Sequence, residues 1–269
     1  MYYLKLFQRS AFKRNPIRTL ILGIKLFFLI IFRLKSKFEI KFGSTSFQFE
    51  FKDEGKYKGG RGIYLFRENI EDLMMYGDQF IKKGDVCIDV GANQGIYTLA
   101  FSSMVGESGT IISIEPQKYA IEKINRFIDL NKFAQPIIIN AALSDKEGIA
   151  TLDMSKGSGY ASIVRNFGKK DTIDVKTTTL DSIIIDNNLS ELDFIKMDIE
   201  GAELDALKGA TDSLKKFKPK ICLECEPERF EQINQYLNKF GYSPYIFNEK
   251  SKFTSIKLLP LNKNCVFFI

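Results

Sequence analysis

The sequence contains no histidine, which removes the commonest general base and the commonest metal ligand of proteins. Any general base must therefore be a carboxylate, a lysine, a tyrosine or solvent. Cysteine is scarce, with four residues at Cys87, Cys222, Cys225 and Cys265. Cys222 and Cys225 have the spacing of a zinc or redox pair, but they fall in a predicted strand, where residues three apart point to opposite faces. We interpret all four as reduced packing residues, which fits a cytosolic protein.

Acidic residues are absent from the first 38 positions, which contain nine of the 39 Lys and Arg residues. The rest of the chain carries 30 basic against 33 acidic residues, so its net charge is slightly negative. A chain with this balance is not a basic nucleic-acid binder. We therefore expect no nucleic acid among its partners.

The sequence also lacks an apolar run of ordinary membrane-spanning length. Residues 17–32 are strongly apolar and flanked by basic residues, but the purest part, residues 20–32, would extend only about 20 Å as a helix. That is short of the roughly 30 Å hydrocarbon core, and no cleavage site with small residues follows. We predict that residues 1–37 are a membrane-associating segment, with an amphipathic helix on the anionic inner face of a membrane. A short spanning anchor and a helix docked on the protein's own core are the alternatives.

Residues 38–79 show a different pattern. Phenylalanine and isoleucine alternate with polar residues over residues 38–51, around Gly43-Ser44, which predicts a hairpin with one apolar face. A helix or helix pair is predicted over residues 64–80. We interpret residues 38–79 as a hairpin and helical cap or lid region in front of a main domain over residues 80–269.

The main domain opens with a buried strand that runs into a glycine turn and then a helix, at residues 85–98. Asp89 lies near the carboxyl end of this strand, and Gly91, Asn93 and Gly95 form the turn. Glycines there permit close approach of a ligand to the backbone, and the helix presents free N–H groups to the same space. In an open α/β sheet, this is where a nucleoside cofactor binds.

Three later strand ends point to the same crevice. Glu115 follows the second strand, 20 residues beyond Gly95, where an acid contacts ribose hydroxyls in doubly wound folds. After the third strand, Ala142 leaves room for an adenine ring, and Asn140 or a nearby amide is placed to read its edge. After the strand at residues 193–198, Lys196 and Asp198 share one face, and Glu200 and Glu203 lie at the start of a helix. Glu224, on the next strand, is a candidate ion-pair partner for Lys196.

These blocks resemble one known family. Four blocks together make the chain similar to the FkbM family of S-adenosylmethionine-dependent methyltransferases. They are Asp89-x-Gly91-Ala92-Asn93-x-Gly95, Glu115-Pro116, Asn140-Ala141-Ala142-Leu143-Ser144-Asp145 and Lys196-x-Asp198-Ile199-Glu200-Gly201-Ala202-Glu203. The resemblance implies an α/β fold of the Rossmann-like class I methyltransferase type. Such a fold has a mostly parallel sheet of seven strands with the last strand antiparallel.

The resemblance also implies a cofactor, a reaction and site residues. S-adenosyl-L-methionine would be bound by Asp89, Gly91, Asn93, Gly95, Glu115, Asn140 and Ala142. Asp198 and Glu200 would border the methyl-transfer site. Because removing a proton from a hydroxyl needs a base, we expect Asp198 to serve first, with Glu200 or Lys196 as the alternatives. The implied reaction is O-methylation, most often of a sugar hydroxyl on a glycan or glycolipid.

Several alternatives stay open. The acceptor is alternatively a lipid, a secondary metabolite or a protein, and a nicotinamide-dependent oxidoreductase is a more distant reading of the glycine turn. No metal site is assigned, although Asp198, Glu224 and Glu226 are an alternative oxygen-ligand set for a divalent cation.

Overall fold

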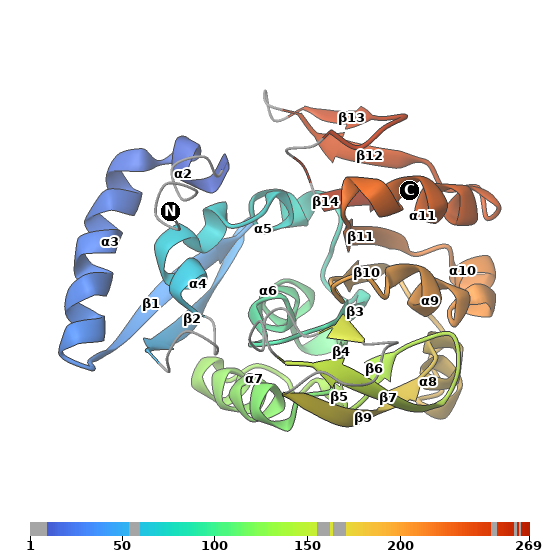
Figure 1. Cartoon of the computed structure of the whole chain (residues 1–269), viewed down its shortest axis with the longest axis horizontal. Helices are drawn as coiled ribbons and strands as arrows, with labels where there is room; N and C mark the ends of the chain where they lie inside the picture. Colours follow the sequence, from blue (N-terminus) through green and yellow to red (C-terminus); the bar gives the residue numbers. More distant parts are fainter. Residues whose placement is uncertain are drawn as a thin grey trace.

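A computed structural model describes residues 10–53, 60–154, 162–163, 171–248, 252–260, 263 and 265–269. At its centre lies an eight-stranded sheet in the order β13-β12-β14-β11-β10-β3-β4-β5 (Figure 1). The strands are β3 (Val86–Val90), β4 (Thr110–Ile114), β5 (Ile137–Ile139), β10 (Phe194–Met197), β11 (Lys220–Glu224), β12 (Pro244–Phe247), β13 (Phe253–Ser255) and β14 (Cys265–Phe268).

The direction of the strands agrees with the expected architecture. β5, β4, β3, β10 and β11 run parallel, and β14 is antiparallel to both of its neighbours, β11 and β12. The predicted count of seven strands is wrong, because β13 pairs with β12 and adds an eighth strand at the edge. With one apolar residue in three positions, β13 has too short a pattern to be recognised from the sequence.

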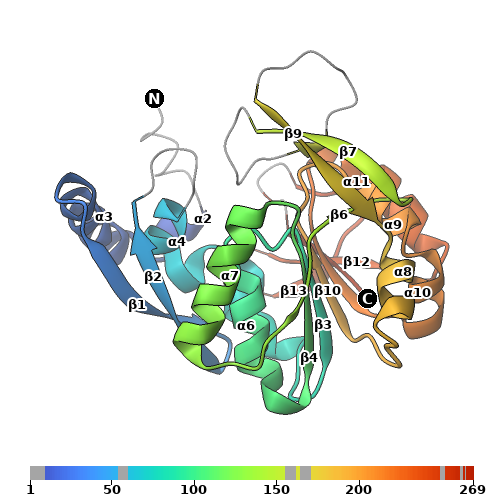
Figure 2. The same cartoon turned by 90° about the horizontal axis from the view of Figure 1, so that it is seen from below.

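Helices cover both faces of this sheet (Figure 2). One face packs on α6 (Ile96–Val105) and α7 (Lys118–Asn131), and the other on α8 (Leu180–Asp186), α9 (Glu203–Lys208), α10 (Thr211–Phe217) and α11 (Pro227–Asn238). Successive strand residues alternate between the two cores: Cys87 and Phe194 face α6, and Ile88 and Ile195 face the opposite layer. Because both faces are buried, the strands are apolar at nearly every position.

A second, smaller sheet lies at the carboxyl edge of the central one. Its order is β6-β9-β7-β8, with bounds β6 (Ala142–Leu143), β7 (Gly148–Asp153), β8 (Ser162–Ile163) and β9 (Thr172–Thr178). β6 follows directly after β5, so the small sheet starts where the third strand of the main domain ends. This placement brings Leu152 of β7 to the candidate site.

The N-terminal part contains the predicted hairpin, formed by β1 (Lys35–Phe42) and β2 (Thr45–Lys52) in antiparallel register. Its buried face carries Phe38, Ile40 and Phe42 on β1 and three further phenylalanines on β2. These side chains belong to the same hydrophobic cluster as α6 and α7. The hairpin therefore has no core of its own.

Between residues 10 and 53 and from residue 60 onward, the N-terminal part also contains the helices α2 (Ser10–Arg14), α3 (Pro16–Ile31), α4 (Arg61–Phe66) and α5 (Asp72–Tyr76). Single 3-10 turns lie at η1 (Arg67–Asn69), η2 (Gly77–Gln79) and, after α6, η3 (Gly106–Ser108). α3 begins with a side-chain cap from Asn15 and a proline at its first position, both typical of a helix start.

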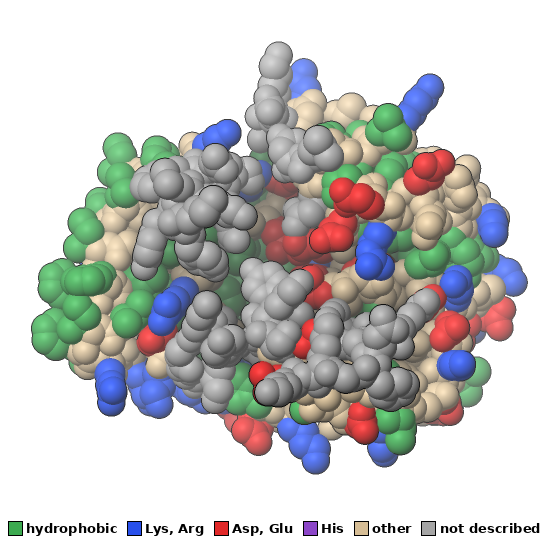
Figure 3. Space-filling view, viewed as in Figure 1, with side chains coloured by type: hydrophobic (Ala, Val, Ile, Leu, Met, Phe, Trp, Pro, Cys, Tyr) green, Lys and Arg blue, Asp and Glu red, His purple; other side chains and the backbone are tan. Residues whose placement is uncertain are grey.

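α3 buries a narrow stripe and exposes the rest. Leu22 and Leu26 are 7% exposed and pack into the shared core, whereas Ile17, Ile24 and Phe32 are 73%, 63% and 63% exposed. Figure 3 shows hydrophobic side chains gathered along the edge of the molecule that α3 occupies. Among the described residues, no helix has the length and apolar character needed to cross a membrane.

Candidate active site

The glycine turn after β3 is shaped by the packing of the chain against itself. Gly91 has φ +77°, and a Cβ at this position would overlap the carbonyl oxygen of Asp198 at the end of β10. Gly95, with φ +80°, is the N-cap of α6, where a Cβ would lie 2.9 Å from Ile124 of α7. Gly91 lines the cavity of the candidate site and Gly95 does not. Both glycines thus let neighbouring elements approach closely.

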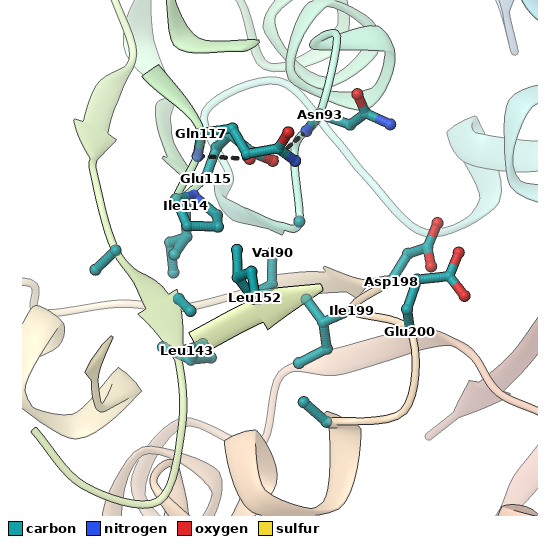
Figure 4. Close-up of a pocket in the computed structure, with 15 residues that line it drawn as sticks. Val90, Asn93, Ile114, Glu115, Gln117, Leu143, Leu152, Asp198, Ile199 and Glu200 are labelled. Atoms are coloured by element: carbon teal, nitrogen blue, oxygen red, sulfur yellow. Dashed lines mark hydrogen bonds between the residues drawn. The ribbon is translucent and has the colours of Figure 1, made fainter. Parts of the chain in front are cut away.

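Glu115 lies at the carboxyl end of β4, is 2% exposed and lines the cavity. Its Oε2 accepts a hydrogen bond from the Asn93 amide at 2.8 Å, and its Oε1 accepts one from the Gln117 amide at 2.9 Å (Figure 4). Burial raises the pKa of Glu115 to about 7, and the two backbone hydrogen bonds oppose this rise. Each oxygen retains a lone pair, so the carboxylate remains able to accept hydrogen bonds from a diol.

An apolar wall lies beside Glu115. This wall of the cavity is formed by four side chains, each at most 7% exposed: Ala141, Ala142, Leu143 and Leu152. Asn140 does not line the cavity. Its side-chain amide donates to the carbonyl oxygens of Glu115 and Pro116, at 3.0 and 2.9 Å, so it fixes the turn that carries Glu115.

Asp89 also lies behind the site. It is 2% exposed, does not line the cavity, and its Oδ2 accepts a hydrogen bond from Thr98 Oγ1 at 2.7 Å. Burial raises the pKa of Asp89 to about 6, and Thr98 and Lys196 oppose this rise. Asp89 therefore links the end of β3 to the first turn of α6.

The cavity contains about 580 Å³ of empty space, part of it open to solvent. Of the predicted site residues, Gly91, Asn93, Glu115, Ala142, Asp198 and Glu200 line it. Asp89, Gly95, Asn140 and Lys196 do not. Leu152 and Gln117 line it as well, and the sequence motifs did not indicate them. The sequence of β7, Gly-Ile-Ala-Thr-Leu-Asp, predicts a strand but does not show which surface Leu152 faces.

Asp198 and Glu200 lie on the side of the cavity away from Glu115 (Figure 4). The Asp198 amide donates to the Val90 carbonyl at 3.0 Å, which continues the pairing of β10 with β3. Glu200 has φ +50° and Gly201 φ +98°, so the chain turns sharply off the strand. Left-handed backbone at a residue other than glycine is strained and is often found at functional sites.

Glu203 stabilises the turn at Glu200 and Gly201 through a hydrogen bond to its backbone. It is 1% exposed, and its Oε1 accepts a hydrogen bond from the Gly201 amide at 2.9 Å. Burial raises the pKa of Glu203, and the backbone hydrogen bonds oppose that rise. Glu203 is thus part of the support of the loop, while Glu200 faces the cavity.

Lys196 is buried under the acidic side of the site, with 1% of its side chain exposed. Its Nζ lies 4.0 Å from Glu71 Oε2 and 5.0 Å from the centre of the Tyr97 ring. Burial lowers the pKa of Lys196, but the carboxyl groups of Glu71, Asp198 and Glu224 outweigh burial and raise it above its ordinary value. The sequence motifs did not indicate Glu71, because it lies far from Lys196 in the chain.

Glu224, at the end of β11, is the neighbour of Asp198 across the sheet, since Met197 pairs with Leu223. The two residues thus lie side by side at the ends of adjacent strands. Burial, with the charges of Glu71 and Asp198, raises the pKa of Glu224 to about 9, so this carboxyl is protonated at neutral pH.

Within the described ranges, no group of three or more Cys, Asp or Glu side chains is placed to bind a metal ion. The four cysteines are all free and buried, as expected for packing residues.

Similarity to known proteins covers the same part of the chain as the site. A family model described as the methyltransferase FkbM domain matches residues 89–244, more than half of the chain. No curated protein matches significantly.

Three solved structures illustrate the structural likenesses. A methyltransferase FkbM from Methylobacillus flagellatus is 16% identical, with a TM-score of 0.47 over 78% of this chain and 53% of that one. Aeropyrum pernix fibrillarin, solved with S-adenosyl-L-methionine, is 10% identical, with a TM-score of 0.43 over 70% of this chain and 67% of that one. A SAM-dependent methyltransferase from Aquifex aeolicus is 15% identical, with a TM-score of 0.41 over 71% of this chain and 84% of that one. The chain thus spans about half the length of the Methylobacillus protein.

The family match begins at Asp89 and includes the turn at Gly91, the carboxyl group of Glu115 and the acidic side formed by Asp198 and Glu200. The four sequence blocks that suggested the resemblance therefore fall inside one matched domain. The chain belongs to the FkbM family of S-adenosylmethionine-dependent methyltransferases.

Proposed function

We propose that this protein transfers a methyl group from S-adenosyl-L-methionine to a hydroxyl oxygen, and that the acceptor is a sugar hydroxyl on a cell-surface glycan or glycolipid. One observation carries this proposal. A single cavity has a buried carboxyl group and an apolar wall at one side, and the carboxylates of Asp198 and Glu200 at the other.

The residues present fit the proposed donor. Glu115 is positioned to accept hydrogen bonds from ribose hydroxyls, and the wall formed by Ala142, Leu143 and Leu152 suits a flat apolar ring. The acidic side suits the positive charge of a sulfonium group. When bound, S-adenosyl-L-methionine supplies an already activated methyl group, so the protein's main tasks are to align the acceptor and to remove its proton.

Asp198 is the proposed general base. It lines the cavity, whereas the neighbouring Glu224, whose pKa is raised to about 9, does not. A carboxylate at the position of Asp198 accepts the proton of a neutral hydroxyl that lies within hydrogen-bonding distance. The carboxylates around it repel anionic acceptors, which favours a neutral sugar hydroxyl over a phosphate or a carboxylate.

The experiment is to incubate the purified protein with methyl-labelled S-adenosyl-L-methionine and, separately, with the membrane, polysaccharide and small-molecule fractions of the host. We expect label in the glycan or glycolipid fraction.

Asp198→Asn should lower incorporation by about 100-fold or more and should still bind S-adenosylhomocysteine. Glu115→Gln should weaken that binding by about tenfold or more, because it removes a charged hydrogen-bond acceptor. Exposed Glu122 provides the matched control, Glu122→Gln, which should match the wild type in both assays.

Label in a lipid, metabolite or protein fraction instead would overturn the choice of acceptor. Full turnover by Asp198→Asn would remove Asp198 from the mechanism. A thermal-shift response to NADH, with none to S-adenosylhomocysteine, would favour the oxidoreductase reading.

We also propose that the protein binds the inner face of an anionic membrane through α3. Nine large apolar side chains between Ile17 and Leu34 are at least half exposed, and Lys25, Arg33, Lys35 and Lys37 are exposed beside them. Sixteen residues extend about 24 Å as a helix, which suits a position in the interface rather than across the bilayer. The basic side chains complement anionic headgroups.

A liposome co-sedimentation assay tests this surface. The double variant Ile24→Glu, Phe28→Glu should release the protein from vesicles that contain anionic lipid, and zwitterionic vesicles should bind the wild type more weakly. The matched control is Ile185→Glu, Leu258→Glu, which alters two side chains that are 72% and 76% exposed elsewhere on the surface. Equal loss of binding in both double variants, or full binding by the α3 variant, would contradict the proposal.

A further inference from the structure

A residue outside the matched domain contacts Lys196, beneath the acidic side of the candidate site. Glu71 precedes α5, in the part of the chain before residue 89, and α5 packs on the central sheet through Tyr76, whose ring centre lies 4.2 Å from that of Phe247 on β12. Tyr97 on α6 donates a hydrogen bond to Glu71 Oε2 at 2.5 Å, and the same oxygen lies 4.0 Å from Lys196 Nζ. Glu71 is therefore held between α6 and β10. Burial raises the pKa of Glu71, while the charge of Lys196 and the hydrogen bond from Tyr97 oppose that rise and favour the carboxylate.

Lys196 is an unusual occupant of a central strand. Its ammonium group is almost fully buried and, in the described part of the chain, has no hydrogen-bond partner. A buried ion pair without good hydrogen bonds contributes little to stability, and an apolar side chain of similar size is often equally stable there. Packing alone thus gives no reason for a lysine at this position.

Three acidic groups of the sheet surround Lys196: Asp89, its register partner on β3, and Asp198 and Glu224, at the ends of β10 and β11. The register of β10 with β11 places Asp198 and Glu224 side by side, and Lys196 lies two residues before Asp198, near the end of β10. Two carboxyl groups this close share one proton, because ionising both places like charges together. A cation near such a pair of carboxyl groups opposes the binding of a second proton to the pair. An anion near the pair opposes the loss of the proton that the two groups share.

Other charged or titratable groups face this set from every packed element. These groups are Asp89 from β3, Cys222 from β11, Cys225 just after β11, Cys265 from β14, Tyr97 from α6, Glu203 from α9 and Asp72 from the start of α5. Asp72 is paired with Arg14 and Lys263, so most of its charge is balanced locally. Glu71 and Lys196 are then the two groups of opposite sign whose charge acts most directly on the carboxyl pair.

We propose that Glu71 and Lys196 are positioning residues of the methyl-transfer site, which together keep one proton on the Asp198–Glu224 pair, with Glu224 protonated and Asp198 available as the base. The inference rests on the proposed role of Asp198. It also assigns a catalytic task to the N-terminal part: this part supplies the anion that completes the site.

Carbon-13 NMR of side-chain carboxyl groups tests the proposal directly, because it needs neither methyl donor nor acceptor. The Glu224 signal, assigned by its loss in Glu224→Gln, should titrate at a pH of about 9 in the wild-type protein. Glu71→Gln should lower this midpoint by about one pH unit or more, since the amide still accepts from Tyr97 but carries no charge. Lys196→Met should raise the midpoint, and Lys196→Arg should restore it.

Glu68→Gln is the matched control. Glu68 lies on the same segment as Glu71 but forms an ion pair with Arg18, so its loss should leave the Glu224 midpoint unchanged. Equal shifts in Glu68→Gln and Glu71→Gln, or a Glu224 signal that titrates below about pH 6, close to an ordinary carboxyl group, would overturn the proposal. A bound S-adenosylhomocysteine signal and a cooperative unfolding transition confirm that each variant is folded.

Methyl transfer provides the second readout. With the acceptor fraction identified by labelling, Lys196→Met should reduce the rate at neutral pH by about tenfold, and Lys196→Arg should recover most of it. Unchanged pH–rate profiles in Glu71→Gln and Lys196→Met would overturn the positioning role, even where NMR shows the shifts. Full activity in Asp198→Asn would instead overturn the proposed function and leave the NMR result standing as a property of the carboxyl pair.

Discussion

Gly91 illustrates how a single residue serves the fold and the site together. The end of β3 and the end of β10 approach so closely there that a Cβ would overlap the Asp198 carbonyl oxygen. The backbone beyond this contact places Asp198 at the cavity. A larger residue at Gly91 would therefore displace the proposed base as well as strain the turn.

Gly91→Ala should lower the free energy of unfolding by about 2–4 kcal/mol, from left-handed backbone strain and overpacking. It should also reduce methyl transfer more strongly than it reduces S-adenosylhomocysteine binding. Urea unfolding measures the stability, the labelled-methyl assay measures methyl transfer, and isothermal titration calorimetry measures S-adenosylhomocysteine binding. Gly23→Ala is the control: Gly23 lies inside α3, and a Cβ added there would have no neighbour within 4 Å, so its replacement should be neutral or stabilising by up to about 1 kcal/mol. Equal stability of the two variants would argue against the close contact at Gly91.

The sequence motifs identified the residues that follow strands directly. Glu115, Asp198 and Glu200 line the cavity because parallel strands bring their carboxyl ends to one edge, and this rule needs no tertiary information. Glu71 and Leu152 were not predicted, because they reach the site from separate elements. The motifs place Asn140 at the ligand, but its amide instead fixes the Glu115 turn, and spacing alone does not distinguish these roles.

The N-terminal hairpin is an element without a core of its own. Phe49 of β2 is 1% exposed, and its ring centre lies 4.3 Å from that of Phe127 on α7. The hairpin therefore depends on α7 for burial, and α7 in turn has one side covered by the hairpin.

Phe49→Ala should lower the free energy of unfolding by about 3–5 kcal/mol. Because the core is shared, the hairpin and the sheet should unfold in a single transition. Amide hydrogen exchange in β1 and β3, alongside urea unfolding, measures this. Lys41→Ala, on the exposed face of the same hairpin, should change stability by less than about 0.5 kcal/mol. Loss of protection in β1 alone, with β3 unaffected, would show instead that the hairpin is an independent unit.

At the same scale, the hairpin and the parallel strands were predictable because both have strong periodic patterns. The alternation over residues 38–51 and the apolar runs of β3, β4 and β10 follow directly from one-sided and two-sided burial. β13 and the pairing of the small sheet were not predictable. Their strands are short or half-exposed, so their order is decided by where the neighbouring elements leave an open edge.

Over the whole molecule, acidic side chains gather inside the candidate site and basic side chains gather at the N-terminal edge. Carboxyl groups are buried at the carboxyl edge of the sheet, while exposed lysines and arginines surround α3. Figure 3 shows acidic side chains near the middle of the face and hydrophobic ones along the α3 edge. The two regions meet at the start of α5, where Asp72 pairs with Arg14 of α2 while the adjacent Glu71 reaches Lys196.

The buried carboxyl groups give the molecule a characteristic dependence of stability on pH. Burial raises the pKa of Asp89 to about 6, of Glu115 to about 7 and of Glu224 to about 9. Unfolded carboxyl groups titrate at about pH 4. Above that pH the unfolded chain binds fewer protons than the native one. The free energy of unfolding therefore falls as the pH rises through the pKa values of these three groups in the native protein.

Without ligand, the thermal midpoint should therefore decrease by about 5 °C or more between about pH 5.5 and about pH 9.5. Glu224→Gln should flatten the most alkaline part of the curve, because the amide keeps a hydrogen-bond donor for Asp198 and does not ionise. Exposed Glu122 again supplies a control, and Glu122→Gln should follow the wild-type curve throughout. Differential scanning calorimetry measures all three proteins. A wild-type midpoint that rises or stays level over this range would mean that the three carboxyl groups are already ionised in the native protein, and the proton on the Asp198–Glu224 pair would then be absent.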